Sequence, residues 1–467
     1  MSTPRIGRTV RRLRQEQNLT QQALAVRLGI SASYLNLIEH EQRAITANLL
    51  IKLGEALRVD LAALSGNAER QLEAGLREAF SDPLLGAEPV PDVDLSGLAA
   101  SSPAAARAIL ALYRAWRVTR EDASGIALPS GRRLLLPTEE TRDAFHERSN
   151  HFPALEEASE TLSAELAVPP SEMGHAIAER MRTRHGLSLR IGPLDGAQIR
   201  HDPAARTIAL SEALSAESHA FHLAFQLMFL ERRDAVEELI QAIAPSSTEA
   251  ASLIRIGLLN YAAGALLMPY EPFRREAMAL RHDVERLAAR FAVSFEQACH
   301  RLSTLQRPNR DGQMRRGIPF FFLRLDPAGN VSKRFSAAGF PFARYGGSCP
   351  RWVVHAAFAT PGSLRVQVAR LPDGATFLCF ARTVAGPPVP WGEPEPVHVV
   401  AMGCDVAHAA DVVYADGLDL EAAAVGIGLS CRLCDRQNCR SRAFPPLDHR
   451  LALDPLTTPD TPYKFTK

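Results

Sequence analysis

The sequence lacks any window of 18 consecutive apolar residues, and its first residues, MSTPRIGRTVRRLRQ, contain no apolar segment of the kind that a secretion signal needs. We therefore expect a cytoplasmic protein with no membrane association. Cysteine is scarce as well, with seven among 467 residues, which excludes a disulfide-stapled scaffold. Lysine accounts for four of the 53 basic residues. An arginine bias of this size can follow from the base composition of the genome alone.

The net charge of +1 conceals an uneven distribution of charge along the chain. Residues 1–65 carry a net charge of +4 and residues 301–467 carry +6, so the segment between them is strongly acidic. Positive ends on either side of an acidic centre suit a protein whose terminal parts meet a polyanion such as DNA.

The segment from residue 5 to residue 64 has the pattern of five short helices. Thr20 is a good N-cap for a helix that ends at Gly29, and Ser31 caps the next helix, SASYLNLIEH. Two short helices joined by a tight glycine turn place the second one in a major groove. Thr46 caps a fourth helix, and a fifth turn is expected from Val59 to Leu64.

The exposed face of the second helix of this pair has short polar and aromatic side chains suited to base edges and phosphates. The arginines between Arg5 and Arg14 can bind the flanking phosphates. The string LTQQALAVRLGISASYLNLIEHEQRAIT resembles the helix-turn-helix of the Xre/Cro/phage-repressor group. The residues expected to contact double-stranded DNA are Gln21, Gln22, Ser31, Ser33, Tyr34, Asn36 and Arg43.

A polar helix and a linker rich in Pro, Asp and Gly, AEPVPDVDLSG, separate this segment from the rest of the chain. The helix predicted at 103–120 has an apolar stripe formed by Ile109, Leu112, Tyr113 and Trp116. Such a stripe favours a core or a dimer interface over a ligand site, and we expect a homodimer.

The middle of the chain combines helices with short strands. Two strongly apolar helices, predicted at 217–231 and 249–268, resemble the helix pair of the IrrE/ImmA metallopeptidase-like domain. That family uses a His-Glu-x-x-His motif to bind zinc and activate water. Here Phe225 and Phe229 stand at the two histidine positions and Gln226 at the glutamate position. These residues cannot ligate zinc or accept a proton from water, so we expect a degenerate domain and no enzyme activity.

Two apolar helices without catalytic residues still suggest a ligand pocket. Tyr261 is predicted to project its hydroxyl into that pocket. Arginines elsewhere in the domain are predicted to bind phosphate groups: Arg182, Arg206 and Arg255. This combination suits a ligand with an acyl tail and an anionic head.

The C-terminal part is predicted to be β-rich, with strands in the alternating segments IPFFFLRLD, GNVSKRF, SLRVQVARL and GATFLCFARTV. Three cysteines lie within nine residues near its end: Cys431, Cys434 and Cys439. In a cytosolic protein such a group is more often a metal site than a disulfide site. Cys349, in the glycine-rich segment GGSCPRW, is the preferred fourth ligand, and Cys404 is the alternative.

The nature of the metal stays open between two kinds of site. Structural zinc is usually held by two short motifs that supply two ligands each. Three thiolates from one loop and a fourth from a distant residue are more usual for an iron–sulfur cluster, here of the 4Fe-4S type. A set of redox-active thiols without metal is a third interpretation.

With all parts in view, the chain resembles the short-chain fatty-acyl transcriptional regulators of the Xre family, of the propionate/methylcitrate- or glyoxylate-cycle type. The helix-turn-helix and four further segments carry the resemblance: LLMPYEPF, GGSCPRW, GCDVAHA and IGLSCRLCDRQNCRSRAFPP. The family implies a DNA-binding regulator that responds to short-chain acyl-CoA and, in some members, holds a C-terminal iron–sulfur site. A repressor controlled by redox state or by a protein partner is the main alternative, and a metallopeptidase-coupled regulator is the third.

These observations predict an α+β multidomain protein. The expected parts are an all-α helix-turn-helix domain (1–65), a helical linker or dimerisation region (66–140), a mixed α/β, degenerate metallopeptidase-like effector domain (141–305) and a β-rich domain with a cysteine cluster (306–467).

Overall fold

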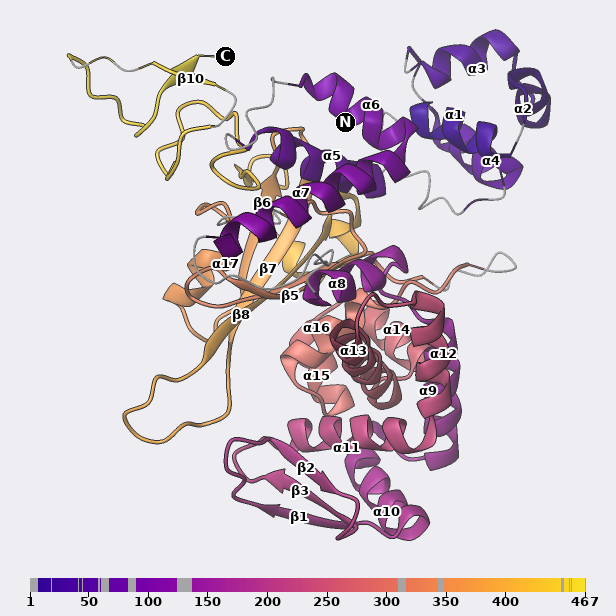
Figure 1. Ribbon diagram of the computed structural model, residues 1–467, viewed down its shortest axis with the longest axis vertical. Coiled ribbons are helices and arrows are strands. Elements are labelled where there is room, and N and C mark those ends of the chain that lie inside the picture. Colours follow the sequence, from indigo (N-terminus) through magenta and orange to yellow (C-terminus); the bar gives the residue numbers. More distant parts are fainter. Residues whose placement is uncertain are drawn as a thin grey trace.

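The structure is a computed structural model (Figure 1). It describes residues 7–17, 19–40, 42–43, 45–57, 59, 67–82, 90–123, 137–309, 316–342, 348–446, 449–452, 454 and 456–466. We call α1 to α4 the head, α5 to α7 the linker helices and everything from α8 onward the body. In Figure 1 the linker helices lie between the head and the body.

The head consists of four short helices around a small apolar core. They are α1 (Gly7–Glu16), α2 (Gln21–Leu28), α3 (Ala32–Glu39) and α4 (Ala47–Leu57). The predicted caps are present: the Thr20 side chain accepts from the Ala23 amide, and the Ser31 side chain accepts from the Tyr34 amide. Gly29 ends α2 with a φ of 68°, a backbone conformation that glycine adopts without strain. The turn predicted after Val59 lies outside the described residues.

The linker helices form a second small unit with its own core. They are α5 (Asn67–Phe80), α6 (Asp92–Ser101) and α7 (Pro103–Ala123). Leu76, Leu95 and Leu110 are almost fully buried where the three helices meet. The apolar stripe predicted on α7 is only partly internal, because Tyr113 is buried while Leu112 is 65% exposed.

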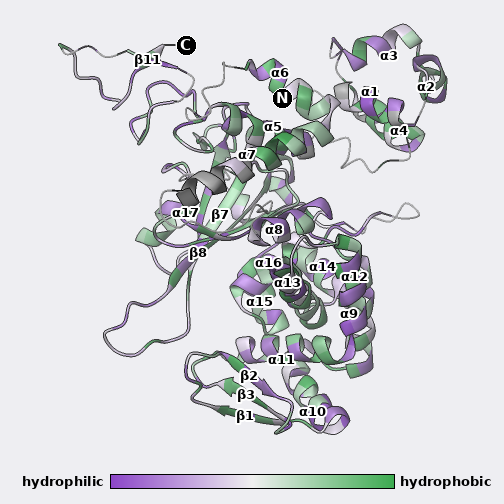
Figure 2. Ribbon diagram, in the orientation of Figure 1, coloured by the Kyte–Doolittle hydropathy of each residue, from purple (hydrophilic) through white to green (hydrophobic). Residues whose placement is uncertain are grey.

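The helices of the body surround one central helix, α13. They are α8 (Pro137–Glu147), α9 (Pro153–Leu166), α10 (Met173–His185), α11 (Ala216–Glu231), α12 (Arg233–Ile243), α13 (Thr248–Leu267), α14 (Tyr270–Ala279), α15 (Val284–Phe291) and α16 (Phe295–Ser303). α13 is long and apolar enough to cross a membrane, but 61% of its most apolar window is buried inside the body. Figure 2 shows it as a hydrophobic helix among amphipathic neighbours, as expected for the core of a domain.

A small three-stranded sheet lies at the far end of the body from the head (Figure 1). Its strands are β1 (Ser188–Gly192), β2 (Ile199–Asp202) and β3 (Thr207–Ser211), in the order β1-β3-β2. β1 and β3 are parallel and were predicted, whereas β2 pairs antiparallel with β3 and was not predicted.

The larger sheet has six strands in the order β5-β4-β8-β7-β6-β9. They are β4 (Phe321–Leu325), β5 (Val331–Ser336), β6 (Arg365–Arg370), β7 (Thr376–Ala385), β8 (Val397–Asp405) and β9 (Ala424–Gly426). A short helix, α17 (Val353–Ala356), and a strand pair, β10 (Arg450–Leu451) with β11 (Phe465–Thr466), complete the body. The central strand β8 was not predicted.

The two faces of the larger sheet have different neighbours. One face contributes Phe322, Phe380 and Cys404 to a core that it shares with the body helices. The other face packs Phe321 and Cys379 against a separate cluster that contains Cys349. The predicted boundary between residues 305 and 306 therefore falls within one continuous core, and the effector and C-terminal segments form a single body.

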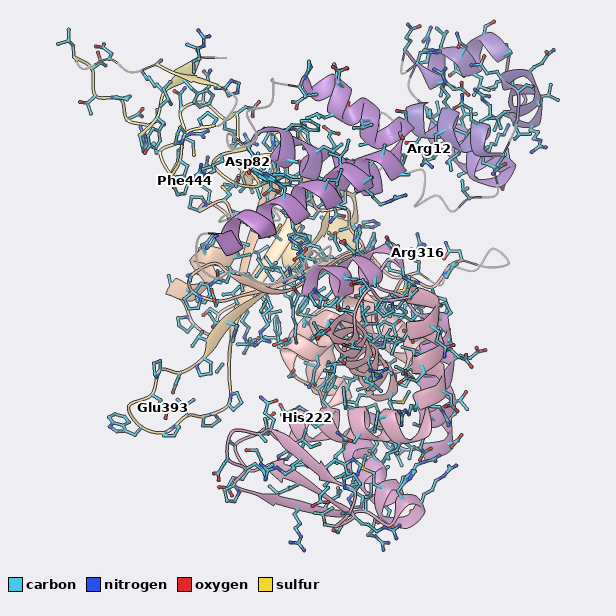
Figure 3. All side chains as sticks on the ribbon, in the orientation of Figure 1. Arg12, Asp82, His222, Arg316, Glu393 and Phe444 are labelled. Atoms are coloured by element: carbon cyan, nitrogen blue, oxygen red, sulfur yellow. The ribbon has the colours of Figure 1, made fainter. Side chains whose placement is uncertain are left out.

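A long hairpin loop, residues 386–396, projects from the body between β7 and β8 (Figure 1). Glu393 is labelled in this loop in Figure 3. The loop also contains Trp391, which is fully exposed. Four of its eleven residues are proline, which restricts the backbone of the loop.

Candidate functional site

The exposed surface of α3 is the candidate DNA-reading face. Ser33 and Asn36 are exposed, and Tyr34 is half-buried against the core of the head. The Gln21 side chain donates to Asn36 Oδ1 at 3.2 Å and to Glu39 Oε2 at 2.8 Å. Gln21 therefore orients a base-reading side chain, while Asn36 keeps its amide donors for a base edge.

The other residues predicted to contact DNA have different surroundings. Gln22 and Arg43 are exposed beside the two helices, where they can contact phosphates. Ser31 uses its hydroxyl as the N-cap of α3, so its first role is to begin the helix.

The expectation that the run of arginines from Arg5 to Arg14 binds phosphate is wrong for Arg14. Its guanidinium is buried and donates to Glu39 at 2.6 and 3.0 Å. Burial alone raises the pKa of Glu39, but hydrogen bonds from Arg14 and Gln21 bring that pKa below its usual value. The pair holds α1 against α3 and leaves Arg11 as the exposed arginine at this point of α1. Arg5 lies outside the described residues.

Arg12 joins the head to the linker helices. Its guanidinium donates to Glu69 of α5 at 3.2 Å and to the carbonyl of Ala100 in α6 at 3.2 Å. Thr9 donates to the same Glu69 carboxylate at 3.3 Å. Figure 3 shows Arg12 at the contact between α1 and the linker helices. These bonds fix the head to the linker through polar contacts and without a shared apolar core.

The four predicted metal-ligand cysteines line one cavity at the end of the body that faces the linker helices. Cys349 comes from the face of the larger sheet opposite to Cys404, and it borders the same cavity as Cys431, Cys434 and Cys439. Cys404 points into the core shared with the helices, so it is on the wrong face of the sheet to join them. The structure thus brings together the preferred set of four thiols.

Two buried arginines give the cysteine loop its shape. Arg442 donates to the carbonyls of Cys431, Cys434 and Arg436 at 2.7 to 2.9 Å. Arg436 donates to the carbonyls of Ile427 and Arg370, which ties the loop to the edge of the sheet. These contacts fold the segment around the cavity and leave the sulfur atoms facing inward.

Gly428 allows Cys434 to approach the chain closely. A Cβ atom at position 428 would lie 2.9 Å from both Cβ and Sγ of Cys434, closer than real Cβ contacts. Burial raises the pKa of the Cys434 thiol, so its deprotonation would have to accompany the binding of a metal.

The donor set fits a metal cluster better than a single ion. Within the described residues, no group of three or more His, Cys, Asp or Glu side chains is arranged closely enough to hold one metal ion. A zinc ion needs four sulfur atoms at about 2.3 Å from one centre. Four thiols that share a cavity without meeting at one point suit a larger group, and all four are of the type that iron–sulfur clusters use.

The degenerate peptidase positions on α11 are part of the core. Phe225 and Phe229 are half-buried and pack against the central cluster of the body. His219, at the start of the same helix, bonds through Nε2 to the carbonyl of Ser211 at 2.8 Å. Neither phenylalanine has a donor atom for a metal, in line with the interpretation drawn from the sequence.

Tyr261 does not project into a ligand pocket. It is 1% exposed and donates to Glu156 Oε1 at 2.6 Å, while burial raises its pKa well above the usual value. Arg301 forms two bonds to the Glu156 carboxylate, at 2.6 and 2.9 Å, and both side chains are buried. The hydroxyl of Tyr261 therefore belongs to an internal polar network that stabilises α9, α13 and α16 against one another.

The three arginines predicted to bind phosphate do not converge on Tyr261. Each is bonded to a residue of its own neighbourhood: Arg182 to Glu179, Arg255 to Glu237, and Arg206 to the carbonyl of His185. Arg182 and Arg206 are also exposed. The predicted acyl-CoA residues thus form no common site in this conformation.

Sequence reasoning missed the residues that organise the middle of the body. Glu156, Arg301 and His151 are far apart in the chain and belong to no motif. Burial lowers the pKa of His151 to about 4, so the ring is neutral at pH 7. A buried arginine in an otherwise apolar helix, Arg301 in α16, is the one signal that the sequence offered.

Three family models match the chain: "Helix-turn-helix" over residues 10–64, "IrrE N-terminal-like domain" over 182–303, and "Short-chain fatty acyl coenzyme A regulator, C-terminal" over 304–463. The propionyl-CoA carboxylase regulator of Cereibacter sphaeroides is 40% identical over 463 residues, which cover 98% of each chain. The HTH-type transcriptional regulators RamB and PrpR of Mycobacterium tuberculosis are each 39% identical over 99% of this chain, and the match covers 99% and 96% of theirs.

A solved structure of a Mycobacterium tuberculosis transcriptional regulator is also similar to this chain. It is 42% identical, with a TM-score of 0.67, and the match covers 70% of this chain and 99% of that one.

Proposed function

Because the chain belongs to the Xre-type family of short-chain fatty acyl coenzyme A regulators, we propose that it is a DNA-binding transcriptional regulator of propionate and short-chain acyl-CoA metabolism. The observation that carries this proposal is the reading face of α3, which is exposed and oriented on a head that resembles known DNA-binding modules. Family membership assigns the chain a regulatory role in the cytoplasm and no enzymatic one.

Binding to selected DNA tests this proposal. The full-length protein is used to select fragments from a genomic library, and affinity for the selected fragments is measured by fluorescence anisotropy at two salt concentrations. We expect Asn36→Ala to lose about 1–3 kcal/mol of binding to the selected sequence relative to random DNA. Gln198→Ala, in the body, is the control. Equal affinity of Asn36→Ala and the unchanged protein would contradict the assignment of the reading face.

The effector in this proposal is a short-chain acyl-CoA bound by the body. The name of the family model matched at 304–463 supports it, whereas the arginines chosen from the sequence do not gather at one site. Propionyl-CoA, acetyl-CoA and free CoA are titrated against the protein–DNA complex. A change in DNA affinity with propionyl-CoA that free CoA does not produce is expected, since a ligand shifts an equilibrium only through its differential affinity.

The third part of the proposal is an iron–sulfur cluster held by Cys349, Cys431, Cys434 and Cys439. When bound, such a cluster supplies a covalent crosslink between the larger sheet and the C-terminal loop, and a group that can change its redox state. Anaerobic purification with iron, sulfide and zinc analysis tests it on the unchanged protein and on Cys349→Ala. Cys379→Ala, a buried cysteine outside the cavity, is the control. A colourless protein with one zinc per chain would replace the cluster by zinc.

The redox-controlled repressor remains the second candidate, because Cys431 and Cys439 are partly exposed. DNA affinity measured with the cysteine site loaded and emptied, each with and without propionyl-CoA, separates the two functions. A response to loading alone would favour redox control.

We also propose a homodimer, in which the linker helices form the contact. Leu112 on α7 is 65% exposed and Val93 on α6 is 60% exposed, which is unusual for large apolar side chains. Leu112→Glu is expected to give a monomer by light scattering, whereas a dimer of unchanged mass would place the interface elsewhere.

A further inference from the structure

A polar cavity lies where linker helix α5 meets α8 and β5 of the body, away from both the reading face and the cysteines. Its polar lining consists of Gln71, Arg142, Asp143, Asn150, Arg334 and Ser336. Phe335 and Phe342 add apolar wall. The space measures about 420 Å³, part of it open to solvent, which is at the small end of the range for ligand pockets. A site of this size suits a small molecule.

Three buried oxygen atoms in this lining have no hydrogen-bond partner among the described residues: Gln71 Oε1, Asn150 Oδ1 and Ser336 Oγ. Asn150 and Ser336 are only 1% and 6% exposed. The orientation of Asn150 is fixed, because its amide nitrogen donates to Ser303 Oγ at 2.8 Å and that hydroxyl donates to the carbonyl of His300. Buried acceptors are normally paired, so these atoms need hydrogen-bond donors from a molecule in the cavity.

Charges of both signs border the cavity. Arg142 and Arg334 each bond to Glu139, and a guanidinium has five N–H donors, more than these bonds use. Asp143 supplies a carboxylate in the same lining. A simple anion would meet Asp143, and a simple cation would meet the arginines. A molecule with a negative group and a positive donor group matches both.

We propose that this cavity binds a free α-amino acid with an apolar side chain. Its carboxylate pairs with Arg142 and Arg334, which favour planar anions. Its ammonium group has three N–H donors for Asp143, Asn150 Oδ1 and Gln71 Oε1. Its side chain packs on Phe335 and Phe342. Each charged or unpaired group in the lining then has a partner.

Such a ligand would connect the linker to the body. Gln71 lies in α5 two residues after Glu69, which holds Arg12 and Thr9 of the head. Asn150 and Ser336 belong to the body. An amino acid bonded to both sides therefore fastens the base of the head, through a site that is independent of acyl-CoA and of the cysteine cavity.

Calorimetry on the full-length protein with alanine, valine and leucine tests this proposal. We expect saturable binding of at least one of them. For leucine, the two comparison compounds are 4-methylpentanoate, which lacks the ammonium group, and 3-methylbutylamine, which lacks the carboxylate. Each is expected to bind about tenfold more weakly or worse than leucine. If none of the amino acids binds, or if either comparison compound binds as well as leucine, the proposal is wrong.

Two variants locate the site. Gln71→Met keeps the length of the side chain and removes the acceptor, and Asp143→Asn removes the charge that meets the ammonium group. Both are expected to weaken amino-acid binding about tenfold, while Gln241→Met, at an exposed position of α12, leaves it unchanged. If Asp143→Asn does not fold, Gln71→Met alone decides. Unchanged binding by Gln71→Met would place the ligand elsewhere. These measurements do not involve DNA, so their outcome is independent of the proposed regulatory function.

Discussion

At the scale of single residues, the ion pair between Glu156 and Arg301 is the polar centre of the body. Both side chains are buried, and Arg301 also donates to the carbonyl of Met268 at 2.8 Å. Burial opposes the charge of Glu156, but Arg301 brings the pKa of Glu156 below its usual value. The pair is therefore charged at pH 7, and each partner depends on the other.

Glu156→Gln is expected to destabilise the body by about 3–5 kcal/mol, because Arg301 would remain buried without a counter-charge. Urea unfolding followed by circular dichroism measures the change. The control is Glu237→Gln, whose pair with Arg255 is about one-third exposed and should contribute less than about 1 kcal/mol. Equal losses in the two variants would contradict the central role of the Glu156 pair.

Buried histidines give the stability of the body a dependence on pH. Burial lowers the pKa of His300 to about 3 and that of His151 to about 4. Below pH about 6.5 the unfolded chain binds protons that the folded chain does not, so stability falls as the pH decreases from there toward the folded values. Each histidine is expected to contribute a slope of about 1.4 kcal/mol per pH unit.

His300→Gln should reduce this slope between pH 6.5 and 5, as measured by urea unfolding at several pH values. His175→Gln, at an exposed position, should leave it unchanged. A slope that does not differ between the two variants would show that acid sensitivity comes from other groups.

At the scale of elements, α3 separates the formation of a reading helix from the act of reading. Ser31 bonds to the amide of Tyr34 and begins the helix, whereas Ser33 is exposed on the face that would meet DNA. One residue therefore contributes to stability and its near neighbour to recognition.

Ser31→Ala is expected to lower the stability of the head by about 1 kcal/mol, since the cap is lost. Ser33→Ala should leave the stability within about 0.5 kcal/mol and weaken DNA binding instead. Thermal unfolding and DNA anisotropy on both variants check this. A reversed assignment, with Ser33→Ala as the destabilising change, would be inconsistent with the hydrogen bond of Ser31.

At the same scale, local signals explain which elements were predictable. Thr20, Gly29 and Ser31 each act on their own turn, so the helix-turn-helix could be predicted closely. β8 was missed because its residues from Val399 to Cys404 are all buried, and a central strand shows no alternation of apolar and polar residues. The arginines chosen for phosphate are bonded to groups that no periodicity reveals.

The same reasoning applies to sites. Cys349 could be selected from a distance of about 80 residues because thiols are rare in this chain and its glycine-rich loop was distinctive. Glu156 and Arg301 could not be paired, since their contact spans 145 positions and depends on the packing of three helices. The cavity beside Gln71 joins three elements and has no counterpart in any one segment.

At the scale of the whole molecule, the head is attached to the rest through few polar contacts. Glu69 of α5 receives Arg12 and Thr9, and the linker helices in turn contact the body through the cavity beside Gln71. The body itself has one continuous core from α9 to the larger sheet. A signal from the body must therefore pass through α5 to reach the reading helix.

Glu69→Gln is expected to reduce the coupling between propionyl-CoA and DNA by about 0.5–2 kcal/mol, while changing DNA affinity without effector by much less. Anisotropy titrations with and without propionyl-CoA measure both quantities. Glu73→Gln, on the same helix but paired with Arg77 of α5, is the control. Intact coupling in Glu69→Gln would show that the signal takes another route.

The positions of the tryptophans turn the architecture into an optical reporter. Trp352 is buried, and its amide bonds to the carbonyl of Cys349 at 3.0 Å, so any light-absorbing group among the four thiols would quench its emission. Trp391 lies in the hairpin loop at the other end of β7 from the strand edge that Arg436 contacts, and it is fully exposed to water. The two indoles should differ in colour, accessibility to iodide and response to loading, so one emission spectrum contains both a signal and its internal reference.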